Sequence, residues 1–276
     1  SDNRINKTEK LKINTRPSIA VICFSKPREQ QVRSFCESNR FPFLKKKNDG
    51  YDLLLLVHDD LTELYDKRLN TSISIDFLHG SMAHRKLFGG GRGQAIARAM
   101  GLKSGVTPSV LDVTAGLASD AFVLATLGCP VTLIERSPIV FNLIKDAIER
   151  ASLSESFQPI LEQGFTVFNC DARDYISGQL AANGDDRTTP PDVIYIDPMY
   201  PERKKSALVK KEMQILQRLH GEDDGNEQLL ALALRYARKR VVVKRPINAE
   251  ILSDIKPNTS VRSKKTRYDI YTIEKM

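Results

Sequence analysis

Residues 193–201 combine an apolar run with an aspartate, two prolines and an aromatic residue, a set that could recognise a flat, amino-bearing ring. The four apolar residues 193–196 predict a buried strand of a parallel sheet. Pro198 cannot donate a backbone hydrogen bond and ends the strand, so Asp197 lies at the carboxyl edge, where open α/β sheets bind ligands. Its carboxylate and the Pro198 carbonyl can accept from an exocyclic amine, while Tyr200 stacks on the ring. The alternative is a plain strand-ending turn, in which Asp and Pro are common.

Three further strands are expected to end in acidic residues, at Asp112, Glu135 and Asp171. Small residues, among them Gly116, form the turn after Asp112 and let a ligand approach the backbone. An acid at the end of the next strand, here Glu135, can hold two ribose hydroxyls. These parts suit an adenosine-bearing cofactor, and the lack of a glycine-rich pyrophosphate turn disfavours a nicotinamide cofactor. S-adenosylmethionine, which has no phosphate, would place its amino-acid part near Asp112 and Gly116.

The elements that position these acids alternate between strand and helix from Pro108 onward. Strands are predicted at residues 110–113, 131–134, 165–168, 193–196 and 241–244, with a terminal pair near 261 and 268–273. Helices are predicted from Asp120, from Pro138 behind a Ser137 cap, and over residues 206–219 and 226–238. Such alternation with short connections predicts an α/β fold with a doubly wound, mostly parallel sheet over residues 78–276.

The first 77 residues are expected to form two different parts. Residues 1–16 are polar and aperiodic and should be disordered, and residues 17–77 should form a small α/β domain. Its strands are predicted at residues 19–24, 51–57 and 73–77, and one helix at 28–39. A second helix is expected over residues 61–69, because apolar residues recur there at helical intervals.

Composition limits the class of protein. The 276 residues carry a formal charge of +8, with a pI near 9.3, which favours a polyanionic partner such as nucleic acid. The four cysteines are scattered and no metal-binding spacing is present, which indicates reduced thiols, no metal and a cytoplasmic protein. No apolar run approaches the length of a membrane span.

A glycine-rich segment over residues 77–93 matches neither a dinucleotide fingerprint nor a P-loop. Its basic residues, including His84, Arg85 and Arg92, favour a ligand-facing loop over the alternative, a flexible hinge between domains. Gly93 is expected to open a helix, whose N-terminus would favour anions.

Five blocks together resemble one family of class I S-adenosylmethionine methyltransferases, the ribosomal RNA small-subunit methyltransferase J family. They are residues 79–93 (with Met82-Ala83-His84-Arg85 and Phe88-Gly89-Gly90-Gly91-Arg92-Gly93), residues 112–125, Asp197-Pro198-Met199-Tyr200, residues 204–213, and Val241-Val242-Val243-Lys244-Arg245-Pro246. The resemblance spans residues 72–273 and implies the Rossmann-like class I fold, a mostly parallel, doubly wound sheet with an antiparallel last strand. One departure is clear: the family usually has Gly-Leu-Gly-Arg-Asp where this chain has Gly116-Leu117-Ala118-Ser119-Asp120.

The resemblance implies methylation of the N2 amine of a guanine in 16S ribosomal RNA, within the hairpin near its 3′ end, on free RNA or on the small ribosomal subunit. Catalysis is then expected at Asp197, Pro198 and Tyr200. The expected cofactor contacts are Asp112, Gly116, Ser119, Asp120, Glu135, Arg136, Asp171, Ala172 and Asp197.

Basic residues near the active edge are expected to bind RNA phosphates. They are His84, Arg85, Arg92, Lys204, Lys205, Lys210, Lys211, Lys244 and Arg245. Two alternatives stay open at this point. A methyltransferase acting on amino groups of DNA or other RNA would share the turn at Asp197, and a noncatalytic RNA-binding protein would keep the basic residues without the strand-end acids.

Overall fold

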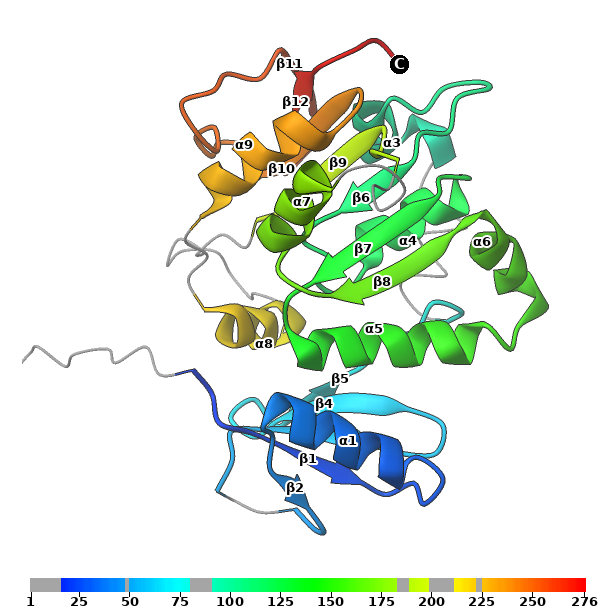
Figure 1. Cartoon of the computed structure of the whole chain (residues 1–276), viewed down its shortest axis with the longest axis vertical. Coiled ribbons are helices and arrows are strands. Elements are labelled where there is room, and N and C mark those ends of the chain that lie inside the picture. Colours follow the sequence, from blue (N-terminus) through cyan, green and yellow to red (C-terminus); the bar gives the residue numbers. More distant parts are fainter. Residues whose placement is uncertain (1–15, 48–49, 80–90, 183–188, 199–210, 222–224) are drawn as a thin grey trace, which may run out of the picture.

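The computed structural model describes residues 16–47, 50–79, 91–182, 189–198, 211–221 and 225–276, which form two α/β domains (Figure 1). The expected tail, most of the glycine-rich segment and the first residues of the helix expected over 206–219 therefore lie outside the described residues. In the N-terminal domain, one five-stranded sheet has the order β2-β1-β3-β4-β5. Its elements are β1 (Ile19–Cys23), α1 (Glu29–Asn39), β2 (Phe43–Leu44), β3 (Leu53–Val57), β4 (Thr62–Asp66) and β5 (Thr71–Ile73).

The prediction of a helix over residues 61–69 is wrong, because this segment contains strand β4. β4 pairs antiparallel with the apolar strand β3, with Leu53 opposite Asp66. Its burial alternates, with Thr62, Leu64 and Asp66 inside the protein, which is the period of a strand. Strand β2 was not expected. β5 also ends at Ile73, earlier than predicted.

The larger domain has a seven-stranded sheet of order β11-β12-β10-β9-β6-β7-β8. Its strands are β6 (Val110–Asp112), β7 (Val131–Glu135), β8 (Phe165–Asn169), β9 (Val193–Ile196), β10 (Arg240–Pro246), β11 (Thr259–Arg262) and β12 (Thr266–Thr272). The five strands from β6 to β10 are parallel, and β12 runs antiparallel to both β10 and β11. The predicted doubly wound sheet with an antiparallel last strand is confirmed.

Helices cover both faces of this sheet. They are α3 (Ala95–Met100), α4 (Ser119–Thr126), α5 (Pro138–Ala151), α6 (Gln158–Gln163), α7 (Ala172–Ala181), α8 (Lys211–His220) and α9 (Asn226–Tyr236). Alternate residues of β9 belong to the cores on the two faces: Val193 and Tyr195 belong to the cluster that includes α4 and α5, whereas Ile194 and Ile196 belong to the cluster that includes α7 and α9. Both faces of a central parallel strand are buried, so its sequence is continuously apolar. The Ser137 cap of α5 accepts from the Val140 amide, as predicted.

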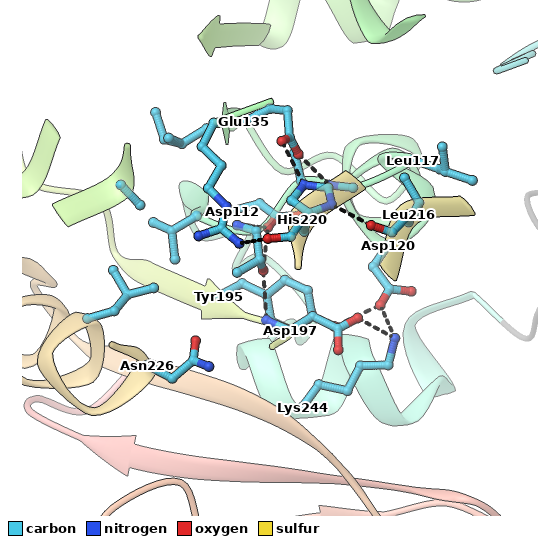
Figure 2. A pocket seen from close by; sticks show the side chains of 18 of the residues that line it. Asp112, Leu117, Asp120, Glu135, Tyr195, Asp197, Leu216, His220, Asn226 and Lys244 are labelled. Atoms are coloured by element: carbon cyan, nitrogen blue, oxygen red, sulfur yellow. Dashed lines mark hydrogen bonds and ion pairs between the residues drawn. The ribbon is translucent and has the colours of Figure 1, made fainter. Parts of the chain in front are cut away.

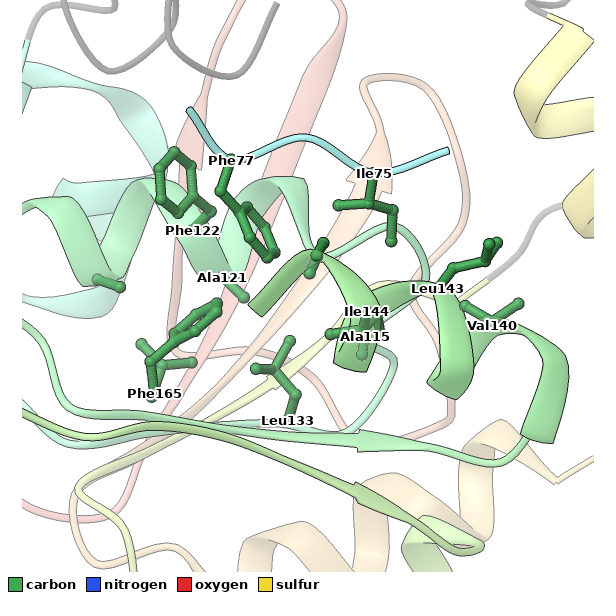
Figure 3. Packing of buried hydrophobic residues seen from close by; sticks show 14 of the residues in the cluster. Ile75, Phe77, Ala115, Ala121, Phe122, Leu133, Val140, Leu143, Ile144 and Phe165 are labelled. Atoms are coloured by element: carbon green, nitrogen blue, oxygen red, sulfur yellow. The ribbon is translucent and has the colours of Figure 1, made fainter. Parts of the chain in front are cut away.

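Aromatic residues join the end of the N-terminal domain to the larger one (Figure 3). Beyond β5, Phe77 packs on Phe122 and Phe157 at ring-centroid distances of 4.9 and 5.8 Å, and edge-on to Phe165 at 5.6 Å. Ile75 and Phe77, expected in a strand, are instead core residues of the larger domain with 1% and 2% exposure. The alternation of apolar residues in this segment therefore reflects burial of Ile75 and Phe77 in the core and not a strand.

A buried polar network also fixes the two domains against each other. Asp146 of α5, 4% exposed, accepts from the Thr62 amide and hydroxyl of β4 at 3.1 and 2.7 Å. Its carboxylate also pairs with Arg28 and Arg150, both at 2.8 Å. Burial alone would raise the pKa of Asp146, but these donors outweigh it and hold the pKa below its usual value. Strand β4 therefore lies directly on α5, the arrangement visible in Figure 1.

Candidate cofactor and substrate site

A cavity of about 320 Å³ lies at the carboxyl ends of β6, β7, β8 and β9. This is the edge at which open α/β sheets bind ligands, and the size falls at the low end for small-molecule sites, roughly 300–1,000 Å³. The cavity is bounded by the strand ends, the turn after β6, and residues of α7, α8 and α9. Residues from the four predicted acidic strand ends all line it: Asp112, Glu135, Asp171 and Asp197.

Thr114 ties the ends of β6 and β9 together. Its hydroxyl accepts from the Asp197 amide at 2.7 Å, and lies 3.3 Å from the Asp112 carboxylate, to which it donates. The Thr114 amide donates to the same Asp112 oxygen at 3.0 Å. Burial raises the pKa of Asp112 to about 7, since these two donors only partly compensate for its lost hydration. Thr114 thus fixes where the backbone at Asp197 begins its turn.

Glu135 joins three parts of the cavity wall. One carboxylate oxygen accepts from the Gly116 amide in the turn after β6, at 3.1 Å. The other accepts from the Ser137 amide at 2.7 Å and from His220 Nε2 of α8 at 3.0 Å. The side chain is 3% exposed, so these contacts hold a buried acid at the place predicted for a ribose contact. Gly116 has φ +52°, the left-handed region that glycine adopts without strain.

Lys244 of β10 points into the cavity and bridges two carboxylates (Figure 2). Its ammonium lies 2.8 Å from both Asp120 and Asp197. Asp120 also accepts from the buried Tyr195 hydroxyl at 2.7 Å. Burial alone would lower the pKa of Lys244, but the two carboxylates raise it above its usual value. Lys244 is therefore protonated, and one cation is shared by two acids.

Asp171 and its neighbours form the far wall. Asp171 caps α7 and pairs with Arg173, whose guanidinium lies 2.9 Å from the carboxylate. This pair holds the pKa of Asp171 below its usual value. Ala172 and Arg136 line the same wall, and Arg136 donates to the His220 carbonyl at 3.3 Å.

The chain matches the family of putative SAM-dependent methyltransferases over residues 38–273. It is 49% identical to Ribosomal RNA small subunit methyltransferase J of Shewanella amazonensis, over 81% of this chain and 88% of that protein. The protein of the same name from Photobacterium profundum is 42% identical over 92% and 97% of the two chains. A SAM-dependent methyltransferase from Neisseria gonorrhoeae shares the fold with a TM-score of 0.70 and 30% identity, covering 92% of this chain and 96% of that one.

The chain belongs to the ribosomal RNA small subunit methyltransferase J family. The fold, the enzyme class and the cofactor expected from the sequence are thereby confirmed. Two further findings concern the described residues only. These residues contain no group of acidic, histidine or cysteine side chains arranged to hold a metal ion. No helix among them has the length and apolar character needed to cross a bilayer.

The residues of this methyltransferase fit S-adenosylmethionine on chemical grounds. The cofactor carries a positive sulfonium and no phosphate, and the side chains that line the cavity include the carboxylates of Asp112, Asp120 and Asp197. All nine residues expected at the cofactor line the cavity, namely Asp112, Gly116, Ser119, Asp120, Glu135, Arg136, Asp171, Ala172 and Asp197. Their individual contacts with the cofactor stay predictions. Ala118, which the sequence comparison singled out as a departure from glycine, adopts φ +59°, a left-handed conformation that costs alanine some strain.

The basic residues are not arranged as the sequence suggested. Lys244 lies within the cavity instead of on its rim. Arg245 is 7% exposed and donates to the Glu250 carbonyl, so its guanidinium is held inside the protein. Arg92 donates to the carbonyls of Lys103 and Leu127. Leu127 follows α4, which runs from the carboxyl edge to the amino edge of the sheet, so Arg92 lies at the edge opposite the cavity.

Of the remaining expected residues, Lys211 is described and exposed at the start of α8. Six lie outside the described residues: His84, Arg85, Tyr200, Lys204, Lys205 and Lys210.

Sequence reasoning missed His220, which is 9% exposed and carried no recognisable motif. Its Nε2 faces the Glu135 carboxylate and its Nδ1 lies 3.0 Å from the Leu216 carbonyl. Both partners are acceptors, so both ring nitrogens must donate and the imidazole is protonated. Burial is the largest single effect and would lower the pKa of His220, but the hydrogen bond to Glu135, the charge of Glu135 and the hydrogen bond to the Leu216 carbonyl together raise the pKa above its usual value of 6.5.

We expect the stabilisation from His220 to depend on pH. Because its pKa is raised in the folded state, the contribution is fully present below about pH 6.5 and is lost as pH rises through the native pKa. Urea unfolding across pH 5.5–9 should show a free-energy gap between wild type and His220→Gln that shrinks with rising pH. His58→Gln, at a half-exposed pair with Glu63, is the matched control. A gap that is constant with pH would contradict a protonated His220.

Proposed function

We propose that this methyltransferase transfers the methyl group of S-adenosylmethionine to the exocyclic N2 amine of a guanine in 16S ribosomal RNA, in the hairpin region near the 3′ end. The observation that carries the proposal is the Asp197 carboxylate at the end of β9, which lines the cofactor cavity beside the buried Pro198. The names of the relatives, which specify ribosomal RNA of the small subunit, support the choice of substrate.

Asp197 is suited to orient an amine. Its Oδ2 is taken by Lys244, and no hydrogen bond within the described residues engages its Oδ1. The side chain is 36% exposed, enough for Oδ1 to be reached from the cavity. An amine that donates one hydrogen to Oδ1 and the other to the Pro198 carbonyl has its lone pair directed away from both acceptors. Asp197 and Pro198 would thus aim the nucleophile.

Lys244 and Asp120 help to hold the Asp197 carboxylate in this orientation. Tyr195 and Lys244 hold Asp120, and Lys244 holds Asp197, so the accepting carboxylate cannot rotate freely. When bound, the cofactor supplies an electrophilic methyl group on a positive sulfur. Alignment of two such reactants is worth at most about 7–11 kcal/mol of the barrier. No strong base is needed, because the amine becomes acidic only as it is alkylated.

The guanine must leave its stack to reach a cavity at the sheet edge, at a cost of a few kcal/mol. Tyr200, which lies outside the described residues, stays our candidate for stacking on the extruded base. Such stacking is typically worth about 1–3 kcal/mol per base.

The turn between β11 and β12 offers phosphate contacts near the cavity. Pro246, at the carboxyl end of β10, pairs with Thr266 at the start of β12, so the turn lies at the same edge of the sheet as Asp197. Arg262, Lys264 and Lys265 are exposed there. We propose that this turn and Lys211 replace Lys244 and Arg245 in the RNA interface, although the acids Glu250 and Asp254 lie exposed in the preceding loop.

Asp197→Asn should slow methyl transfer about a hundredfold or more, equivalent to about 3 kcal/mol. The substitution keeps the shape but can turn an NH2 donor towards the substrate amine. Single-turnover methylation at saturating cofactor and RNA measures the effect, and RNA affinity should scarcely change. Asp192→Asn, at the opposite end of β9, is the matched control and should retain the rate. Near-normal transfer by Asp197→Asn would leave Asp197 with a capping function only.

Salt dependence separates the proposed interface from the one expected from sequence. Lys264→Gln should reduce the slope of log K against log salt for RNA binding by about 0.7–0.9, the value for one phosphate contact. Arg92→Gln removes the same charge at the opposite edge and should leave the slope unchanged. Equal slopes for wild type and Lys264→Gln, or a smaller slope for Arg92→Gln, would contradict the interface proposed at the turn.

A further inference from the structure

Helix α8 forms one wall of the cofactor cavity, yet few of its residues are buried. It contributes Glu212, Met213, Leu216 and His220 to the lining. Only Ile215 and Leu216 are fully buried among its ten residues. Hydrophobic packing is the usual source of helix stability in proteins, and in this helix it comes from Ile215 and Leu216, with Leu219 partly buried against the same core. The polar residues of α8 add further contacts that place it on the cavity.

The last turn of α8 carries two ion pairs that reach in different directions. His220 pairs with Glu135, inside the cavity, at 3.0 Å. Arg218 pairs with Asp66, the last residue of β4 in the N-terminal domain. Cations at a helix C-terminus also interact favourably with its dipole. The end of α8 is thus held between the cofactor cavity and the N-terminal domain.

Asp66 is a rigid anchor. It is 0% exposed, and its other carboxylate oxygen accepts from the Leu69 amide at 3.0 Å in the turn that follows β4. The strand itself is paired on both sides, with β3 and with β5. A buried carboxylate needs its partner, because an unpaired charge in the interior is costly. The Arg218 guanidinium therefore has a partner whose position is fixed, the Asp66 carboxylate.

Strand β4 contacts the larger domain at both of its ends. Its first residue, Thr62, bonds to Asp146 of α5, and its last, Asp66, bonds to Arg218 of α8. Figure 1 shows α5 and α8 between the large sheet and the N-terminal domain. The first contact joins the N-terminal domain to α5, and the second joins it to α8.

We propose that the N-terminal domain positions α8 on the cofactor cavity through the ion pair between Asp66 and Arg218, and so sets the affinity for S-adenosylmethionine. Arg218 and Asp66 are positioning residues, since neither lines the cavity. They act through Leu216 and His220, which do. The inference rests on the proposed function only in taking this cofactor as the ligand of the cavity.

The test compares two arginines that join the same domains. Arg218→Gln breaks the contact to α8, whereas Arg28→Gln weakens the contact at Asp146 without touching α8. Calorimetry without RNA should show a rise of about tenfold in the cofactor Kd for Arg218→Gln, within the range of 5- to 150-fold typical of coupled sites. Arg28→Gln should keep the wild-type Kd even if its melting temperature falls as far as that of Arg218→Gln.

Hydrogen exchange supplies a readout that does not depend on the cofactor. In the ligand-free protein, the amides of α8 should exchange faster in Arg218→Gln than in wild type or Arg28→Gln, because the helix loses its anchor. If Arg218→Gln does not fold, Arg218→Lys keeps the charge while losing the guanidinium fork, and should raise the Kd to a smaller extent.

An unchanged Kd in the folded Arg218 variant, or equal rises in the Arg218 and Arg28 variants, would overturn the proposal. Because the measurement omits RNA, either result leaves the choice of guanine as substrate untouched. Failure of wild type itself to bind S-adenosylmethionine would instead count against the proposed function.

Discussion

The ammonium of Lys244, shared between Asp120 and Asp197, is the interaction on which the site depends. Two carboxylates at the edge of a buried sheet repel each other and lose hydration, so they need a common counterion. Lys244 can supply it because β10 runs parallel to β9 in the sheet and ends at the same edge. The arrangement leaves one oxygen of Asp197 available to an incoming amine. Strand order and charge balance together determine the geometry of the proposed chemistry.

A second set of charges connects the site to the rest of the molecule. Glu135 accepts from the turn after β6, from the start of α5 and from α8, so three walls of the cavity converge on one carboxylate. The N-terminal domain reaches the same wall through Asp66 and Arg218. This small domain carries no recognisable chemistry in its sequence, and the contacts of β4 give it a structural connection to the cavity. Contacts thereby run from the N-terminal domain through α8 to the wall of the cavity.

The sequence predicted the sheet and the acids well, for a physical reason. Strands such as 193–196 are continuously apolar because both faces are buried, and Asp197 follows at once with a proline behind it, so local pattern and global position agree. The prediction failed at β4, where Leu61, Leu64 and Tyr65 allow a helical interpretation and pairing with the apolar strand β3 decides the outcome. The sequence pattern also could not predict contacts between segments that are distant in the chain. Lys244 and Arg245 are adjacent and both basic, yet one faces the cavity and the other is buried, because successive residues of a strand point to opposite faces.

His220 marks the limit of prediction from a single sequence, because its partner lies 85 residues away and nothing local signals it.

The central claim is that this protein methylates the N2 amine of a guanine in 16S ribosomal RNA. The most direct measurement uses 16S RNA from a strain that lacks the gene, incubated with the purified protein and isotopically labelled S-adenosylmethionine. The RNA is then digested and its nucleosides are identified by mass spectrometry. We predict that the label appears in N2-methylguanosine, and that fragment mapping places it in the 3′-end hairpin region. Label in methyladenosine or 7-methylguanosine, or the absence of label from RNA that is bound, would contradict the account.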